Sequence, residues 1–160
     1  MIVVVLACSV QSYAQKGMQG VGVNFATNVV DAFAPGGGVK YQYNISNYVR
    51  LEPSFSLYGL AEDDGFSMAG MLNVHLFFSS PRSLRPYFFA GAGYVNFAFY
   101  SNDYWGDYKE DKGGVGADAG LGLDWRLSHK ISLQLEAGVL AGSEDAQIGG
   151  KFNLGVCYNF

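Results

Sequence analysis

The chain has 160 residues, which is the length of a single domain. Its 22 glycines and its 16% aromatic residues, beside only 15% charged residues, favour strands and turns over helices. The formal net charge of −4 argues against a nucleic-acid partner, which would need a clustered basic face. Past the N-terminal segment, no apolar run approaches the roughly 20 residues of a membrane-spanning helix, so we expect no such helix.

The first 14 residues are predicted to be a secretory signal peptide, which leaves residues 15–160 as the mature domain. Residues 2–7 are apolar, and the small residues Ser12 and Ala14 precede the predicted cleavage before Gln15. Two alternatives remain, an apolar first strand and a lipid-attachment box in which Cys8 is acylated. After cleavage only Cys157 would remain, so no intramolecular disulfide is expected.

Apolar and polar residues then alternate with a period of two in eight segments of about 9 to 14 residues. The segments cover residues 20–28, 37–45, 48–58, 67–78, 86–99, 114–127, 131–140 and 151–160. They are longer than the usual soluble strand of about 5 or 6 residues. They match the 9 to 11 or so residues with which a tilted strand crosses a bilayer. The pattern predicts an all-β fold, an eight-stranded antiparallel up-and-down transmembrane β-barrel.

One set of alternate residues is apolar in each segment and is predicted to face outward. The last segment shows the set most clearly, with Phe152, Leu154, Val156, Tyr158 and Phe160. The fifth segment is apolar on both faces, and there we assign Tyr87, Phe89, Val95 and Phe97 outward.

The opposite set carries eight charges, four positive and four negative: Lys40, Arg50, Glu52, Asp118, Asp124, Arg126, Glu136 and Lys151. The interior of an eight-stranded barrel is just wide enough for side chains to fill it. Charges enclosed there must be paired, because an unpaired buried ion is very costly. We therefore predict a structural charge network in the lumen. The alternative is that this set forms a solvated outer face.

The connections between segments differ in charge at the two ends of the barrel. Residues 29–35, 60–66, 100–112 and 141–147 hold ten acids and two lysines, a net charge of −8. Residues 46–47, 79–85 and 128–130, with Lys16, hold four basic residues, including Arg85. The acidic end also has the longest predicted connection. Short periplasmic turns and longer outer loops are typical of outer-membrane barrels, so we expect the acidic loops outside the cell and the apolar set against lipid.

Three short stretches carry a family resemblance: the terminal YNF, the segment RPYFFAGAGY at residues 85–94, and SYAQ at residues 12–15. With them the chain resembles the small eight-stranded outer-membrane β-barrel proteins of the OmpA/OmpX type, the outer membrane protein beta-barrel domain group. The resemblance implies a place in the bacterial outer membrane. It also implies that Phe152, Leu154, Val156, Tyr158 and Phe160 form an assembly signal read by the barrel-assembly machinery.

No catalytic, cofactor or metal site is expected. His75 is predicted near the periplasmic end as a hydrogen-bonding lumen residue, and His129 as a solvated turn residue. Neither lies within reach of an outer-leaflet substrate, so we expect no enzyme. The acidic loops lack the ligand spacing of a calcium loop. Loosely held divalent cations could still bridge them to lipopolysaccharide phosphates.

Within residues 100–112, Tyr104, Trp105 and Tyr108 alternate with acids, a composition typical of binding surfaces. They are predicted to form a surface recognition loop for a ligand, although rings at such a position also occur in the interfacial aromatic belt.

Together the patterns predict a monomer in contact with outer-membrane lipid and lipopolysaccharide, with a side-chain-plugged lumen and a structural or surface-interaction role. Two alternatives are a narrow porin for small solutes and a secreted lipocalin-like carrier whose apolar set lines a cavity.

Overall fold

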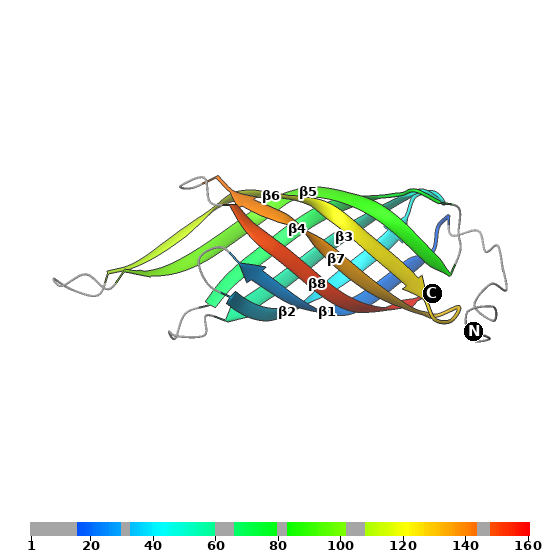
Figure 1. Ribbon diagram of the computed structural model, residues 1–160, viewed down its shortest axis with the longest axis horizontal. Helices are drawn as coiled ribbons and strands as arrows, with labels where there is room; N and C mark the ends of the chain where they lie inside the picture. The colour runs from blue at the N-terminus through cyan, green and yellow to red at the C-terminus, as the bar shows by residue number, and fades with distance from the viewer. Residues whose placement is uncertain (1–15, 30–32, 60–65, 80–82, 102–107, 144–147) are drawn as a thin grey trace, which may run out of the picture.

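The computed structural model describes residues 16–29, 33–59, 66–79, 83–101, 108–143 and 148–160; of these, 28–29, 33, 66, 97–101 and 108–112 are described by backbone only. The described residues form eight antiparallel strands that close into a barrel by pairing of the first with the last (Figure 1). The strands are β1 (Gln19–Val29), β2 (Phe33–Asn44), β3 (Val49–Gly59), β4 (Phe66–Phe77), β5 (Leu84–Ser101), β6 (Tyr108–Arg126), β7 (Ile131–Gly142) and β8 (Ile148–Asn159). The predicted fold is confirmed. The predicted signal peptide and Cys8 lie outside the described residues.

Helices long and apolar enough to cross a membrane are absent from the described residues.

Strand β1 begins and β8 ends at the same end of the barrel, and the two strands pair along their length. The amide of Gln19 donates to the carbonyl of Phe160 at 3.1 Å, and the amide of Phe160 donates back at 2.8 Å. Two turns at this end are held by serine hydroxyls. Ser46 Oγ accepts from the amide of Val49 at 3.0 Å, and Ser128 Oγ accepts from the amide of Ile131 at 3.1 Å. We call this the terminal end of the barrel.

At the opposite end, β5 and β6 continue as a two-stranded hairpin (Figure 1). Strand β6 begins at Tyr108, whereas the sequence pattern predicted a start at Gly114. Residues 100–101 and 108–112 were predicted to belong to a connection, but they lie in β5 and β6, so the prediction is wrong for these residues. The alternation fails there, but the backbone ladder from Phe97↔Lys112 to Ser101↔Tyr108 still pairs the two strands. The connections at the two ends consequently differ little in length, and the projecting hairpin distinguishes the ends instead.

The apolar set faces outward on the described strands other than β5. Val23 is 62% exposed, Val115 68% and Phe152 43%, whereas the charged residues of the alternate set are buried with one half-buried exception, Arg126. On β8 burial alternates at every residue. This arrangement is the reverse of the one that a lipocalin-like carrier needs.

Strand β5 corrects one prediction. Tyr87, Phe89 and Val95 are buried in the lumen, while Tyr94 is exposed on the outside, so the predicted outward assignment is wrong. The side chain of Phe97 lies outside the described residues. Both sets of β5 are apolar, so alternation could not choose between them.

Glycines on the neighbouring strand explain the choice. Tyr87 pairs with Gly122, and Phe89 with Gly120. A Cβ on Gly120 would lie 2.7 Å from Phe89 Cζ, and one on Gly122 would overlap the Tyr87 ring. The large rings therefore face inward where β6 leaves space for them.

Candidate functional site: the polar lumen

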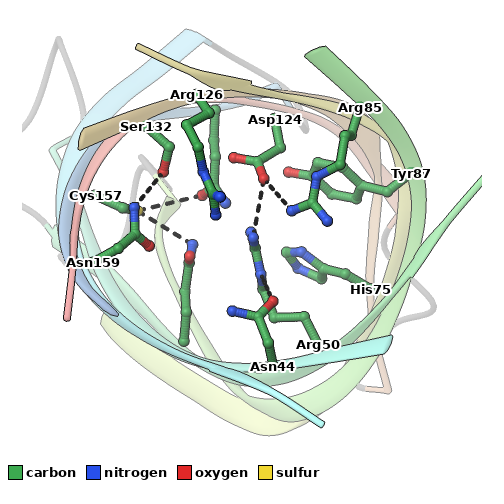
Figure 2. Close-up of polar contacts among 12 residues, drawn as sticks. Asn44, Arg50, His75, Arg85, Tyr87, Asp124, Arg126, Ser132, Cys157 and Asn159 are labelled. Carbon is green, nitrogen blue, oxygen red and sulfur yellow. Dashed lines mark hydrogen bonds and ion pairs between the residues drawn. The ribbon is translucent and has the colours of Figure 1, made fainter. Parts of the chain in front are cut away.

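Near the terminal end, charged side chains from three strands meet inside the barrel (Figure 2). Arg85 Nη2 donates to Asp124 Oδ2 at 2.6 Å, and Arg50 Nη2 donates to the same oxygen at 3.0 Å. Both guanidinium groups also lie over the Phe77 ring, with Cζ 3.8 Å (Arg85) and 4.8 Å (Arg50) from its centroid. We call Arg50, Arg85 and Asp124 the arginine cluster.

Arg85 was predicted in a connection, but it is the second residue of β5 and is 1% exposed. The described lumen charges are thus five positive and four negative, and the predicted neutral balance is wrong. The missed signal was in the sequence: Arg85 precedes Tyr87 by two residues and shares its face. Because the wrong face of β5 was assigned to the lumen, both Arg85 and Tyr87 were missed as lumen residues.

Farther from the terminal end, Glu52 (β3), His75 (β4) and Glu136 (β7) converge across the lumen. His75 Nε2 lies 3.8 Å from Glu52 Oε1 and 3.9 Å from Glu136 Oε1. We call these three residues the central cluster. Lys40 Nζ lies beside it, 3.6 Å from Glu52 Oε1.

Neutral side chains hold the two carboxylates of the central cluster. Gln42 Nε2 donates to Glu52 Oε2 at 2.7 Å, and Asn153 Nδ2 donates to Glu136 Oε2 at 2.8 Å. The Tyr87 hydroxyl donates to Glu136 Oε1 at 2.7 Å, and its ring stacks on the His75 imidazole with centroids 4.6 Å apart. Each carboxylate is therefore fixed in direction.

His75 lies in the lumen, but its predicted hydrogen bonding is wrong. The side chain is 0% exposed, and neither ring nitrogen has a hydrogen-bond partner among the described residues. His129 is exposed in the turn between β6 and β7.

The remaining predicted lumen charges form hydrogen bonds with residues outside these two clusters. Lys151 Nζ donates to Asp118 Oδ2 at 2.5 Å, and both side chains are buried. Arg126 is half-buried and donates to Met18 Sδ at 3.3 Å. The thiol of Cys157 is buried, and Gln42 Nε2 donates to its sulfur at 3.2 Å.

The other predicted site residues lie on the outside of the barrel or beyond the described residues. The five residues of the predicted assembly signal, Phe152, Leu154, Val156, Tyr158 and Phe160, are all exposed, four on β8 and the last at its end. Tyr104 and Trp105 lie outside the described residues. Tyr108 begins β6 and is described by backbone only.

A closed antiparallel barrel with an apolar exterior and an ionic interior has the architecture of an outer-membrane β-barrel protein. The family model of the outer membrane protein beta-barrel domain matches residues 1–160, and the chain belongs to this family. It is a barrel of the bacterial outer membrane, and its apolar exterior is compatible with contact with membrane lipid.

Solved structures of outer-membrane barrels share the fold. The N-terminal β-barrel domain of Pseudomonas aeruginosa OprF is 21% identical, with a TM-score of 0.68 over 92% of this chain and 100% of that chain. Neisserial surface protein A is 13% identical, with a TM-score of 0.69 over 89% of this chain and 96% of that chain. Ail, the attachment invasion locus protein of Yersinia pestis, is 20% identical, with a TM-score of 0.62 over 91% of this chain and 99% of that chain. No curated protein matches the sequence.

Proposed function

We propose that this barrel is a structural and surface-interaction protein of the outer membrane, and that its β5–β6 hairpin meets the partner. The register of the strands carries this proposal. Strand β4 pairs with β5 as far as Met68↔Asn96, and β7 pairs with β6 as far as Gly142↔Gly116. Beyond these pairs, residues 97–101 of β5 and 108–112 of β6 pair with each other. The paired strands of the hairpin thus extend past the rim, and residues 102–107 join them in the sequence.

The composition of the hairpin restricts the chemistry of the partner. Asp103, Tyr104, Trp105, Asp107 and Tyr108 lie at or beside the tip in the sequence. Acids with aromatic residues favour a partner with cationic groups and apolar surface over a polyanion, because like charges repel. Ail has been solved in complex with the heparin analogue sucrose octasulfate. The acidic tip of this chain makes a sulfated ligand an unfavourable choice here.

We expect the acidic connections to lie outside the cell, where divalent cations could bridge them to lipopolysaccharide phosphates. The outward side chains of β8 would serve the barrel-assembly machinery as the recognition strip. The barrel would be a monomer, because closure leaves its described strands without a free edge inside the membrane.

The lumen is proposed to be closed by side chains. The ion pairs Arg50–Asp124 and Lys151–Asp118 join different strands at different depths, and their side chains are buried. The rival function is a narrow porin. Single-channel recording in planar bilayers should show no ion conductance above that of the bare membrane; a steady conductance would favour the porin.

Orientation can be tested with single cysteines on intact cells. Asp103→Cys at the hairpin tip should react with a membrane-impermeant maleimide, and Ser128→Cys in the β6–β7 turn should not. The native Cys157 is buried and should add no background. Labelling of Ser128→Cys but not of Asp103→Cys would show that the barrel has the opposite orientation and that the hairpin is not at the cell surface.

The role of the hairpin can be tested by shortening it at a registered pair. Asn96 and Gly113 are paired across the two strands. Residues 97–112 can therefore be replaced by a new Asn-Gly dipeptide, which forms a tight two-residue turn between Asn96 and Gly113. The shortened barrel should fold and restore detergent resistance to cells that lack the protein. Adhesion of those cells to a surface coated with a cationic, aromatic-rich peptide should fall to the level without the protein. Unchanged adhesion would overturn the proposed role.

A further inference from the structure

The central cluster contains a buried polar group without a bond. Both nitrogens of His75 are buried, and neither has a hydrogen-bond partner in the described part of the chain. Burying a polar group without a partner typically costs about 1 to 3 kcal/mol. An unbonded ring beside two carboxylates calls for a physical explanation, and an ion bound between them would supply the bond that Nε2 lacks.

The geometry of the cluster fits a small cation. One atom each of Glu52, His75 and Glu136 lie within 4.8 Å of one another. An ion at equal distance from three such atoms, given the two measured separations of 3.8 and 3.9 Å, lies roughly 2.2 to 2.5 Å from each. Zinc bonds to nitrogen and oxygen are about 2.0 to 2.2 Å long, so the site needs to contract by only a few tenths of an ångström.

The two glutamates are held as ligands in a metal site are held, whereas Nδ1 of His75 has no partner among the described residues. Ligands in such sites are usually oriented by hydrogen bonds from a second layer of residues. Here Gln42 holds the far oxygen of Glu52, and Asn153 holds the far oxygen of Glu136. The near oxygen of Glu136 accepts from Tyr87, and a carboxylate oxygen has a second lone pair left for a metal.

We infer that Glu52, His75 and Glu136 form a binding site for one divalent transition-metal ion, with His75 Nε2 and one oxygen of each glutamate as ligands. One imidazole and two carboxylates suit Zn²⁺ and its first-row neighbours better than the all-oxygen ions Mg²⁺ and Ca²⁺. The ion would cross-link β3, β4 and β7 through the lumen. The site is independent of the surface role proposed for the hairpin.

Lys40 is the natural competitor for this site. Its ammonium lies 3.6 Å from Glu52 Oε1 and has no hydrogen-bond partner among the described residues. With a neutral imidazole, two carboxylates and one ammonium give a local charge of −1, and a divalent ion changes it to +1. Lys40 therefore weakens the site, and its replacement by an apolar residue strengthens it.

Arg50 and Arg85 affect the entry of the ion. Arg50 precedes Glu52 by two residues on β3 and lies nearer the terminal end. Two buried guanidinium groups on this side repel a cation that approaches the finished barrel. The ion is therefore expected to bind during folding, and the test must supply it at that stage.

The test uses the full chain, refolded from urea into detergent micelles with Zn²⁺ and then passed through a chelating column. The wild type should retain about one zinc per barrel, measured by elemental analysis, and His75→Gln should retain none. His129→Gln is the matched control, because it removes the exposed histidine, and should retain the wild-type amount. Folding of each variant is checked by its gel mobility with and without heating.

Three further variants keep the test decisive if His75→Gln fails to fold. Glu52→Gln preserves shape and should abolish zinc retention. Lys40→Met should slow the removal of zinc by a chelator. Asn153→Ala, which leaves every ligand in place, should weaken binding by roughly 10- to 100-fold. Refolding with Co²⁺ should give visible ligand-field absorption in the wild type but not in His75→Gln.

Three results would each contradict the proposed site. The first is that the wild type retains no metal after refolding. The second is that His75→Gln and Glu52→Gln retain as much metal as the wild type. Loss of zinc in His129→Gln alone would place the metal at the surface.

Discussion

The arginine cluster and the central cluster are neighbours in the lumen, since Arg50 faces His75 in the register of β3 and β4. Each member of the arginine cluster makes at least one charge-assisted hydrogen bond. In the central cluster the two glutamates are bonded, but His75 is not. The difference teaches that buried polar groups in one lumen can serve two purposes. The arginine cluster joins strands through its own hydrogen bonds, whereas the central cluster contains a histidine whose ring nitrogens are not bonded within the described residues.

Breaking the arginine cluster should have the largest effect. Asp124→Asn removes the carboxylate that two buried guanidinium groups share and should lower the free energy of unfolding by about 3 to 5 kcal/mol. The measurement is urea unfolding of the barrel refolded into lipid vesicles. The control is Lys130→Gln at an exposed turn, which should change stability by less than about 0.5 kcal/mol. Equal effects of the two changes would contradict a structural role for the cluster.

Tyr87→Phe tests the second layer of the central cluster. It removes a hydrogen bond to the buried carboxylate of Glu136 and should cost about 1.5 to 3 kcal/mol, because bonds to charged groups are the stronger ones. Tyr158→Phe, on the exposed outer face, is the matched change and should be nearly neutral. A neutral Tyr87→Phe would show that Glu136 does not depend on this bond. Urea unfolding reads out both variants.

Gly122→Ala tests the reason given for the inward face of β5. The added methyl would overlap the Tyr87 ring and should destabilise the barrel by about 1 to 3 kcal/mol. Gly37→Ala serves as the control, since its Cβ would meet its nearest atom, the carbonyl oxygen of Asn24, at 3.4 Å. The same unfolding measurement applies, and a harmless Gly122→Ala would remove the packing explanation.

His75→Phe should have the smallest effect when no metal is supplied. The change replaces an unbonded polar ring with an apolar ring that can stack on Tyr87, so stability should stay within about 1 kcal/mol. A loss of several kcal/mol would show that His75 is bonded to the glutamates after all. With zinc at 100 times its dissociation constant, the wild type alone should gain about 2.7 kcal/mol.

The fold followed from the sequence because alternation is a local signal. On β7 and β8 one set of residues is apolar and the other polar, and this suffices to assign both faces. On β5 both sets are apolar, and the assignment failed. It could be made only from the neighbouring strand, where Gly120 and Gly122 lie opposite Phe89 and Tyr87.

The candidate site was predictable only in part. Glu52 and Glu136 could be assigned to the lumen, and His75 to a position near one end of it. Their meeting could not be predicted, because it depends on how β3, β4 and β7 are placed around the closed barrel. Likewise, the sequence showed which charges needed partners but did not pair Arg50 with Asp124, which is 74 residues away.

The sequence by itself determined a barrel with an apolar exterior, because a period of two assigns alternate side chains to opposite faces without reference to any other strand. Only the tertiary structure decided the inward face of β5, the length of the β5–β6 hairpin and the convergence of the central cluster. These features depend on register and on the space beside neighbouring residues, and both arise only when the strands pair and the cylinder closes.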